Sequence, residues 1–245
     1  MHQSTDRVFL DHAPRSVALV AMGPSVVDYI TDTFTQEYKK EWVDEVWAIN
    51  MASQGIWHDV VFWMDDLVGQ NGFRPDLMAG LRARGKPVVT TVRNRDLVPL
   101  SYDYPAQEVV QLGWECFGRP YLNNGVVMAV AYALWKGVKR LRIYGADFTY
   151  PNRNYAEAGR ACIEAWIVFA SSKGMHVSVS GSSSLFDAIS SHAGIYGFRE
   201  QPELLINGER IKFIKGAQPT EESEPAYIPE DAVGHPGHLN GAARA

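Results

Sequence analysis

The hydrophobic positions in the first half of the chain fall into short, nearly uninterrupted apolar runs. Residues 16–22, 46–49 and 60–63 form three of these runs, and each stops at polar residues. Residues 87–92 form a fourth run, rich in β-branched side chains. Uninterrupted apolar runs of this length are typical of strands buried on both faces of a parallel sheet. We therefore predict four strands here.

Between these runs the hydrophobic pattern changes to helical spacing. Val27, Ile30 and Phe34 recur at that spacing within residues 26–38, which predicts a helix directly after the first strand. Residues 74–85 predict a second helix, which ends at a glycine.

The second half of the chain continues the alternation. An apolar helix is predicted over residues 126–135, a strand over 140–144, a long helix over 155–172 and a strand over 175–179. The Pro-rich stretch before them is mixed in pattern, and we predict one short strand there, over residues 108–112.

Strands that alternate with helices specify an α/β fold, here a Rossmann-like, doubly wound and mostly parallel sheet flanked by helices. An Asn-Gly pair at residues 207–208 separates two arms of alternating polarity and predicts a C-terminal β-hairpin within residues 203–214. We expect one nucleotide-binding catalytic domain over residues 1–216. Residues 217–245, rich in Pro, Glu, Gly and Ala, are expected to form a disordered or loosely packed tail.

Composition narrows the class of protein. The chain has 245 residues, 46% of them hydrophobic, and a formal net charge of −5, as in ordinary globular proteins. Its two cysteines, Cys116 and Cys162, are too few and too far apart for a disulfide scaffold or a metal motif. No apolar run reaches the roughly 18–20 residues of a membrane span, so we expect a cytoplasmic protein. The excess of acidic over basic residues does not indicate nucleic-acid binding, although a nucleic acid remains a possible acceptor substrate.

Ligands of doubly wound sheets bind at the carboxyl ends of the strands, so the polar residues there are the candidates for a site. The turn Gly23-Pro24-Ser25 follows the first strand, and Asn50 ends the second. Backbone amides of such a turn, with the start of the next helix, can hold a phosphate or approach a ribose closely. An ordinary strand-to-helix turn is the structural alternative.

The residues Asn123, Asn124 and Gly125 open the apolar helix of the second half. Side-chain amides and unpaired backbone N–H groups at a helix start would suit a nucleotide phosphate. Taken alone, however, Asn is better explained as a helix cap.

A further group follows the strand over residues 140–144. Asp147, together with Gly145, ends that strand, and Tyr150 and Tyr155 lie shortly beyond it. A carboxylate there can accept ribose hydroxyls, and phenols can donate hydrogen bonds to a departing phosphate as charge builds on it. In the structural alternative, the aspartate binds its own loop and the tyrosines pack beneath it.

Taken in this order, the motifs resemble the bacterial sialyltransferases of glycosyltransferase family 42. The resemblance implies a Rossmann-like glycosyltransferase that takes a sugar from a nucleotide-sugar donor, without an obligatory metal and with no metal ligands. It implies that Tyr150 and Tyr155 assist departure of the nucleotide phosphate. The residues that it places at the nucleotide are Gly23, Pro24, Ser25, Asn50, Asn124, Gly125, Gly145 and Asp147.

Two departures from that family concern the chemistry. Met22 stands where those enzymes carry an Asn before the Gly-Pro-Ser turn, and the histidine that serves them as general base has no counterpart. Glu157 is our first candidate for the base, with a solvated glutamate in the first turn of a helix as its structural alternative. Asp65, Asp66 and His192 are the further candidates.

The same order of motifs also resembles uncharacterised proteins related to archaeal hydroxymethylpterin diphosphokinases. That resemblance implies a Mg-dependent transfer from ATP to a small heterocycle, with Asp65, Asp66 and Asp147 as metal ligands. A third alternative is a nucleotide-binding module without turnover. The first interpretation is our prediction: the partners are a nucleotide sugar and an acceptor hydroxyl on a glycan or a modified nucleic-acid base, with no membrane. The sequence does not reveal the oligomeric state.

Overall fold

Seven parallel strands form the central sheet of the computed structural model, which describes residues 13–35, 42–187, 204–206 and 209–211. The strand order is β5-β4-β3-β2-β1-β6-β7, and every neighbouring pair is parallel. The strands are β1 (Ser16–Val20), β2 (Glu45–Ile49), β3 (Val60–Trp63), β4 (Val88–Thr90), β5 (Ser101–Asp103), β6 (Arg140–Tyr144) and β7 (His176–Val179). The predicted α/β, Rossmann-like class is confirmed.

The order of the strands reverses at β1. The chain first adds β2, β3, β4 and β5 on one side of β1, and then crosses to add β6 and β7 on the other. In a doubly wound sheet such a reversal opens a crevice at the carboxyl ends of the two strands that flank it.

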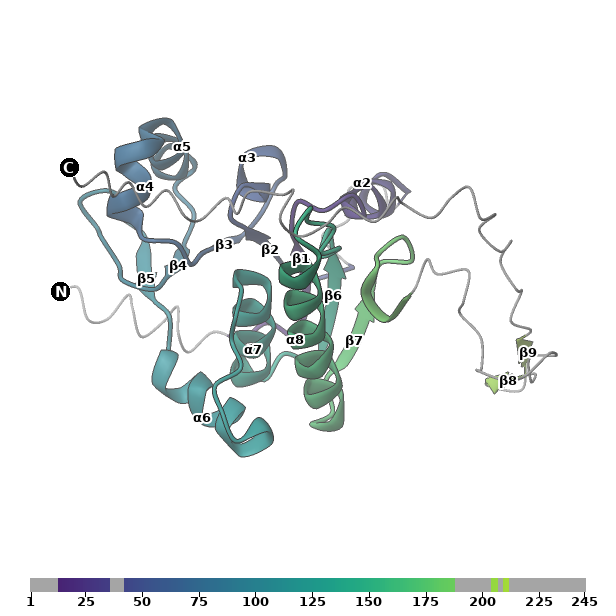
Figure 1. Cartoon of the computed structure of the whole chain (residues 1–245). Coiled ribbons are helices and arrows are strands. Elements are labelled where there is room, and N and C mark those ends of the chain that lie inside the picture. The colour runs from purple at the N-terminus through teal and green to yellow at the C-terminus, as the bar shows by residue number, and fades with distance from the viewer. Residues whose placement is uncertain (1–12, 36–41, 188–203, 207–208, 212–245) are drawn as a thin grey trace, which may run out of the picture.

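Helices cover both faces of the sheet (Figure 1). One layer consists of α6 (Ala106–Phe117), α7 (Gly125–Lys136) and α8 (Arg153–Ser172), of which α7 and α8 run side by side. The other face carries α2 (Val26–Thr35), α4 (Leu67–Phe73) and α5 (Pro75–Arg84), while the short α3 (Ala52–Gly55) follows β2.

The largest part of the core lies under α7 and α8. Trp47 and Phe62 of the sheet pack with Tyr132 of α7, with ring centroids 5.1–5.5 Å apart. Trp166 of α8 is fully buried in the same cluster. Because this layer is anchored by large rings, the first turns of α7 and α8 have fixed positions relative to the strand ends.

One predicted strand is wrong. Residues 108–112 belong to the helix α6. The apolar residues Val109, Val110 and Leu112 lie within the predicted strand, but the fully buried residues of this helix are Val109 and Gly113, four residues apart. That is the spacing of one helical face.

Two further elements escaped the sequence pattern. The strand β5 is only three residues long and includes the exposed Asp103, and α4 contains two glycines, which are poor helix formers.

The helix α2 is confirmed, but Val27, Ile30 and Phe34 are exposed, and Tyr29 is the residue that packs on the sheet.

The predicted hairpin is also confirmed. β8 (Leu204–Ile206) pairs antiparallel with β9 (Glu209–Ile211). The tail over residues 217–245 and His192 lie outside the described residues, so the domain boundaries stay a prediction. None of the helices in the described part of the chain combines the length and apolar character needed to cross a bilayer.

Candidate functional site

A cavity of about 390 Å³ lies at the carboxyl ends of β1, β2 and β6, beside the reversal of strand order. Its walls are residues 21–24 after β1, residues 49–51 at the end of β2, residues 145–150 after β6, and Val126 of α7. Three loops that are distant in sequence thus enclose one space, as the doubly wound fold predicts.

The loops after β1 and β6 are locked together by hydrogen bonds. The amide of Gly23 donates to the carbonyl of Gly145 over 2.7 Å, and the amide of Gly145 donates to Ser25 Oγ over 3.0 Å. The amide of Ser25 donates to Asp147 Oδ2 over 2.7 Å. Ser25 is buried and does not line the cavity, so its visible role is to hold the two loops in place.

The two glycines of this lock are required by close approach. A Cβ atom on Gly23 would lie 2.3 Å from Asp147 Oδ2 and 2.6 Å from the carbonyl oxygen of Gly145. Gly145 has a φ of +67°, and a Cβ there would lie 2.2 Å from the carbonyl oxygen of Ala21. Both contacts are closer than non-bonded atoms can approach, so neither position accepts a side chain unless the backbone moves.

Two buried acceptor oxygens at the wall of the cavity have no hydrogen-bond donor among the described residues: Asp147 Oδ1 and Asn50 Oδ1. Asp147 as a whole is only 4% exposed. Leaving a buried polar group unpaired costs about 1–3 kcal/mol, and such groups are rare in native proteins. Two residues of the cavity wall thus each carry a buried acceptor without a donor among the described residues.

Asn50 has a left-handed backbone conformation. Its φ of +46° lies in a region that Asn adopts more often than most residues other than glycine. Its side-chain amide donates to Asp65 Oδ2 over 3.2 Å, and its Oδ1 has no hydrogen-bond donor among the described residues.

The side chain of Asn124 is used for helix capping. Its Oδ1 accepts from the amide of Val127 over 3.0 Å, and its Nδ2 donates to Asn123 Oδ1 over 2.8 Å. Asn123 in turn donates to the carbonyl of Ala158 in α8. Asn124 does not line the cavity, whereas the first turn of α7 reaches it through Val126. The capping alternative is thus confirmed.

The two tyrosines lie next to each other at the rim. Their ring centroids are 5.3 Å apart, and both side chains are about half exposed. Tyr150 lines the cavity, whereas Tyr155 packs on Tyr150 from α8. Burial, and secondarily the neighbouring Tyr155, raises the pKa of Tyr150 above its ordinary value, so this phenol is a hydrogen-bond donor at neutral pH.

Phe148 is a wall residue that sequence reasoning missed. Its φ is +51°, and its ring lies against Gly159 of α8, where an added Cβ would come within 2.5 Å of Phe148 Cδ1. Gly159 therefore provides the space that lets Phe148 bridge α8 and the cavity. The only sequence signal was its place between Asp147 and the tyrosines.

A serine-rich loop after β7 was also missed. Ser183 Oγ donates to the carbonyl of Ala146 over 3.2 Å, and Ser184 Oγ donates to the carbonyl of Asp147. Ser182 donates from both its amide and its hydroxyl to Asp28 of α2. The run of serines directly after a strand was the available signal. This serine loop fixes the backbone that carries Asp147.

The candidate bases occupy different places. Glu157 is bound to Arg153 over 2.8 Å, one turn away on α8, and does not line the cavity. Asp66 caps α4 by accepting from the amides of Val68 and Gly69. Asp65 is exposed, and its hydrogen bond to Asn50 holds it beside the cavity wall.

The metal-ligand set implied by the diphosphokinase resemblance does not come together. Among the described residues, no group of three or more His, Cys, Asp or Glu side chains could hold a metal ion. Asp147 is bound to the Ser25 amide, Asp66 caps a helix and Asp65 contacts Asn50. The proposed trio of Asp65, Asp66 and Asp147 is therefore corrected: these carboxylates serve three separate purposes.

Comparisons with known proteins give a fold-level likeness. No protein-family model and no curated protein sequence matches the chain. The sialyltransferase CstII from Campylobacter jejuni, in complex with the substrate analogue CMP-3FNeuAc, is 14% identical, with a TM-score of 0.43, over 69% of this chain and 81% of CstII. A mutant of the alpha-2,3/8-sialyltransferase CstII is 13% identical, with a TM-score of 0.43, over 70% of this chain and 84% of that one. Both belong to the class of enzyme that the motifs resemble, and at this level the likeness concerns the fold alone.

Proposed function

We propose that this protein is a glycosyltransferase that binds the nucleoside part of a nucleotide-sugar donor in the cavity at the ends of β1, β2 and β6. The observation that carries the proposal is that two residues of its wall each have a buried acceptor, Asp147 Oδ1 and Asn50 Oδ1, for which the described residues supply no donor. Ribose hydroxyls and the amino groups of nucleobases are donors of the matching kind. The frame formed by Gly23, Ser25 and Gly145 would keep these acceptors in position before the donor binds.

The departing phosphate would lie between Tyr150 and the start of α7. The amides of Gly125 and Val126 have no acceptor among the described residues, and the helix dipole favours negative charge there. Tyr150, another residue of the cavity wall, would supply a phenolic donor, and Tyr155 contacts its ring. Donors that are fixed in advance stabilise the charge that develops as the bond to the sugar breaks.

The charge of the cavity bears on the kind of donor. No Lys, Arg or His is among the described residues that line it, and Asp147 contributes a carboxylate. A triphosphate would bring several negative charges into this environment, whereas a sugar linked through a single phosphate brings far fewer. This observation favours a nucleotide sugar with few phosphates over ATP.

For the general base we infer Asp65. Its carboxylate is bound to Asn50, a residue of the cavity wall, while Glu157 forms its ion pair with Arg153 outside the lining. A base must come within hydrogen-bond reach of the proton that it removes, either directly or through one water. Asp65 would accept the proton of the acceptor hydroxyl, and that oxygen would attack the sugar carbon as the nucleotide leaves.

Titration calorimetry against a panel of nucleotides and nucleotide sugars, with and without a chelator, tests the proposal. We expect binding of a nucleoside monophosphate and of its sugar derivative, unchanged by chelation. Binding of ATP that requires Mg²⁺ would contradict it in favour of the diphosphokinase. Binding with neither donor hydrolysis nor transfer would leave a nucleotide-binding module without turnover.

The base assignment is tested with matched variants once a donor is known. Asp65→Asn should leave the donor's dissociation constant unchanged and slow the turnover by about 100- to 10,000-fold. Glu157→Gln, a conservative change in a carboxylate outside the lining, should change turnover much less. The reverse ranking would return the role to Glu157.

A further inference from the structure

The cavity at the ends of β1, β2 and β6 has an apolar mouth. Three large side chains that line it are also exposed to solvent: Met22 after β1, Met51 after β2 and Tyr150 after β6. These residues are 59%, 38% and 52% exposed, respectively. A side chain that lines a cavity and also reaches solvent lies where the cavity opens. Met22, Met51 and Tyr150 are therefore the mouth residues.

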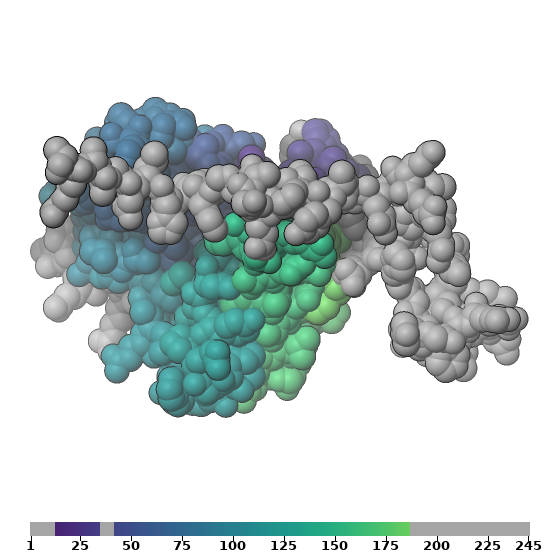
Figure 2. Space-filling model, in the orientation of Figure 1, coloured from purple at the N-terminus to yellow at the C-terminus, as the bar shows by residue number. Residues whose placement is uncertain are grey.

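The sheet brings the mouth residues together. The strand β1 pairs with β2 on one side and with β6 on the other, and Val20 is in register with Ala48 and with Tyr144. Paired strands lie about 4.8 Å apart, so the loops that leave these three strands begin side by side. In Figure 2, the purple surface of α2 and the blue surface of α3–α5 lie along the upper edge of the view. The mouth belongs to this edge, because the loops after β1 and β2 lead into α2 and α3.

The mouth carries no charged side chain among the described residues that line the cavity. The one charged residue of that lining, Asp147, is only 4% exposed and so lies inside. Exposed apolar side chains that gather in one place mark binding surfaces. Methionine side chains adapt to the shape of an apolar partner and make favourable contacts with aromatic rings. The mouth therefore suits an uncharged group that is apolar or aromatic.

The proposed function, on which this inference rests, brings the acceptor substrate to the mouth. The nucleoside is assigned to the buried oxygens of Asp147 and Asn50, so the acceptor substrate would approach from the open side. Asp65, the inferred base, is bound to Asn50, and Met51 is the next residue in the chain. A hydroxyl within reach of Asp65 would thus lie close to Met51.

We propose that the acceptor substrate carries an apolar or aromatic group beside the hydroxyl that receives the sugar, and that Met22, Met51 and Tyr150 bind this group. Its affinity would grow with the apolar area that the mouth residues remove from water. Of the acceptors that the sequence left open, an aromatic base has such a surface, whereas a polar glycan offers little of it.

The test compares two ligands that carry the same sugar and differ in one aromatic ring: phenyl β-D-glucoside and methyl β-D-glucoside. Their dissociation constants are measured by ligand-detected NMR titration of the full-length chain, in the presence of a saturating nucleoside monophosphate. We expect the phenyl glucoside to bind about tenfold more tightly, since the mouth residues cover its ring.

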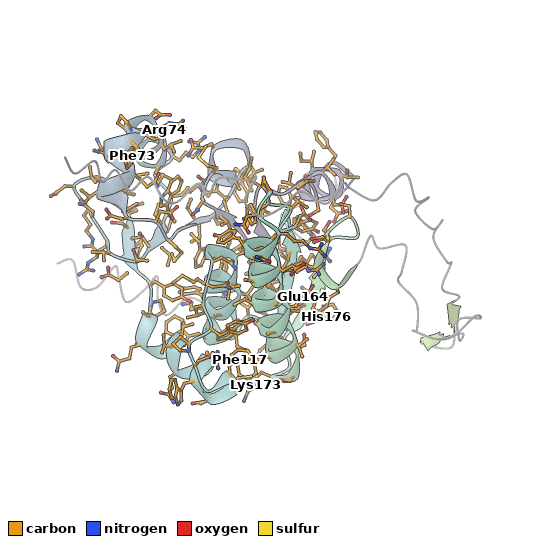
Figure 3. The ribbon with its side chains drawn as sticks, viewed as in Figure 1. Phe73, Arg74, Phe117, Glu164, Lys173 and His176 are labelled. Carbon is orange, nitrogen blue, oxygen red and sulfur yellow. The ribbon has the colours of Figure 1, made fainter. Side chains whose placement is uncertain are left out.

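The variants Met22→Ser and Met51→Ser each remove apolar surface from the mouth without adding charge. Each should reduce the preference for the phenyl glucoside by about 3- to 10-fold. The matched control is Phe73→Ser. Phe73 is 86% exposed at the end of α4 that borders α5 (Figure 3) and does not line the cavity. This variant should keep the preference of the wild type.

Equal affinities for the two glucosides, or no detectable binding of the phenyl glucoside, would overturn the inference. So would a preference that persists in both methionine variants. The proposed function is judged separately, because calorimetry measures nucleoside monophosphate binding first. Absence of nucleotide binding would contradict the proposed function, whereas nucleotide binding without a preference for the phenyl glucoside would contradict only the assignment of the mouth.

Discussion

At the residue scale, the proposed donor site depends on two buried oxygens of cavity-lining residues that have no hydrogen-bond donor among the described residues. Asp147 serves two purposes: its Oδ2 fixes the Gly-Pro-Ser turn through Ser25, while its Oδ1 is one of these two oxygens. The amide of Asn50 is bound to Asp65, and its Oδ1 is the other. The sequence could suggest both residues as strand-end polar groups, but not which oxygen is left for a ligand.

Gly23→Ala tests the close approach of the two loops. The new methyl group would lie 2.3 Å from Asp147 Oδ2, so we expect a loss of about 1–3 kcal/mol in unfolding free energy, together with weaker donor binding. Urea denaturation and calorimetry measure the two effects. Gly72→Ala in α4 is the control, since nothing lies within 4 Å of the added carbon, and it should be neutral or slightly stabilising. An equal loss in both variants would argue against the steric explanation.

Tyr150→Phe tests the phenolic donor. It retains the ring in the cavity wall and removes only the hydroxyl, so donor binding should persist while transfer slows by about 10- to 1,000-fold. Tyr155→Phe should have a smaller effect, because Tyr155 contacts Tyr150 and does not line the cavity. Steady-state rates at saturating donor give the comparison. An unchanged rate in Tyr150→Phe would remove its assigned role.

At the element scale, strands buried on both faces were the easiest to predict, because their apolar runs are short and end abruptly at polar or turn residues. The error at α6 concerned a stretch of mixed, Pro-rich pattern, whose helix buries Val109 and packs Leu112 and Phe117 against the core. Close contacts between elements were also beyond prediction. The bond from Ser25 to Asp147 joins residues 122 positions apart, and the serine loop contacts the backbone of residues 146 and 147 from a different strand end.

The serine loop gives a prediction at this scale. Ser184→Ala removes the hydroxyl that holds the carbonyl of Asp147, so the Asp147 loop should become less ordered, and donor affinity should fall by about 2- to 10-fold. Calorimetry with the best-binding nucleotide measures the change. Ser172→Ala removes a comparable bond, from a hydroxyl to the Phe169 carbonyl at the far end of α8, and should leave affinity intact. The same affinity in both variants would show that the loop does not support the site.

At the scale of the whole molecule, alternating strands and helices predicted the doubly wound sheet and the edge where the site lies. The separate roles of Asp65, Asp66 and Asp147 were not predictable, because they depend on which neighbouring amides each carboxylate meets. The orientation of α2 was not predictable either. Three apolar residues at helical spacing predicted the helix, but they did not show that Tyr29 would be the residue that packs on the sheet.

Global stability should depend on His58. Burial is the main cause that lowers the pKa of His58 below 6.5, and the positive charges of Arg84 and Lys86 lower it further. The hydrogen bond to the Ile56 carbonyl and the negative charge of Asp59 oppose this shift. The folded state therefore favours the neutral ring, so this contribution to stability is complete above pH 6.5 and declines as the pH falls toward the lowered pKa. Urea denaturation at pH 7.5 and pH 5.5 should show a smaller decrease for His58→Asn than for the wild type. Identical decreases would contradict this assignment.

In the proposed complex, Asp147 Oδ1 accepts a hydrogen bond from the nucleotide. Asp147→Asn is nearly isosteric and can keep the bond from Ser25, but it can present a donor where the ligand also has one. Calorimetry with a nucleoside monophosphate should show a dissociation constant about 10- to 100-fold higher than for the wild type. Asp76→Asn, an equivalent change on the exposed surface of α5, should show none. If Asp147→Asn binds the nucleotide as tightly as the wild type while the fold is intact, the cavity does not bind the donor in the way that we propose.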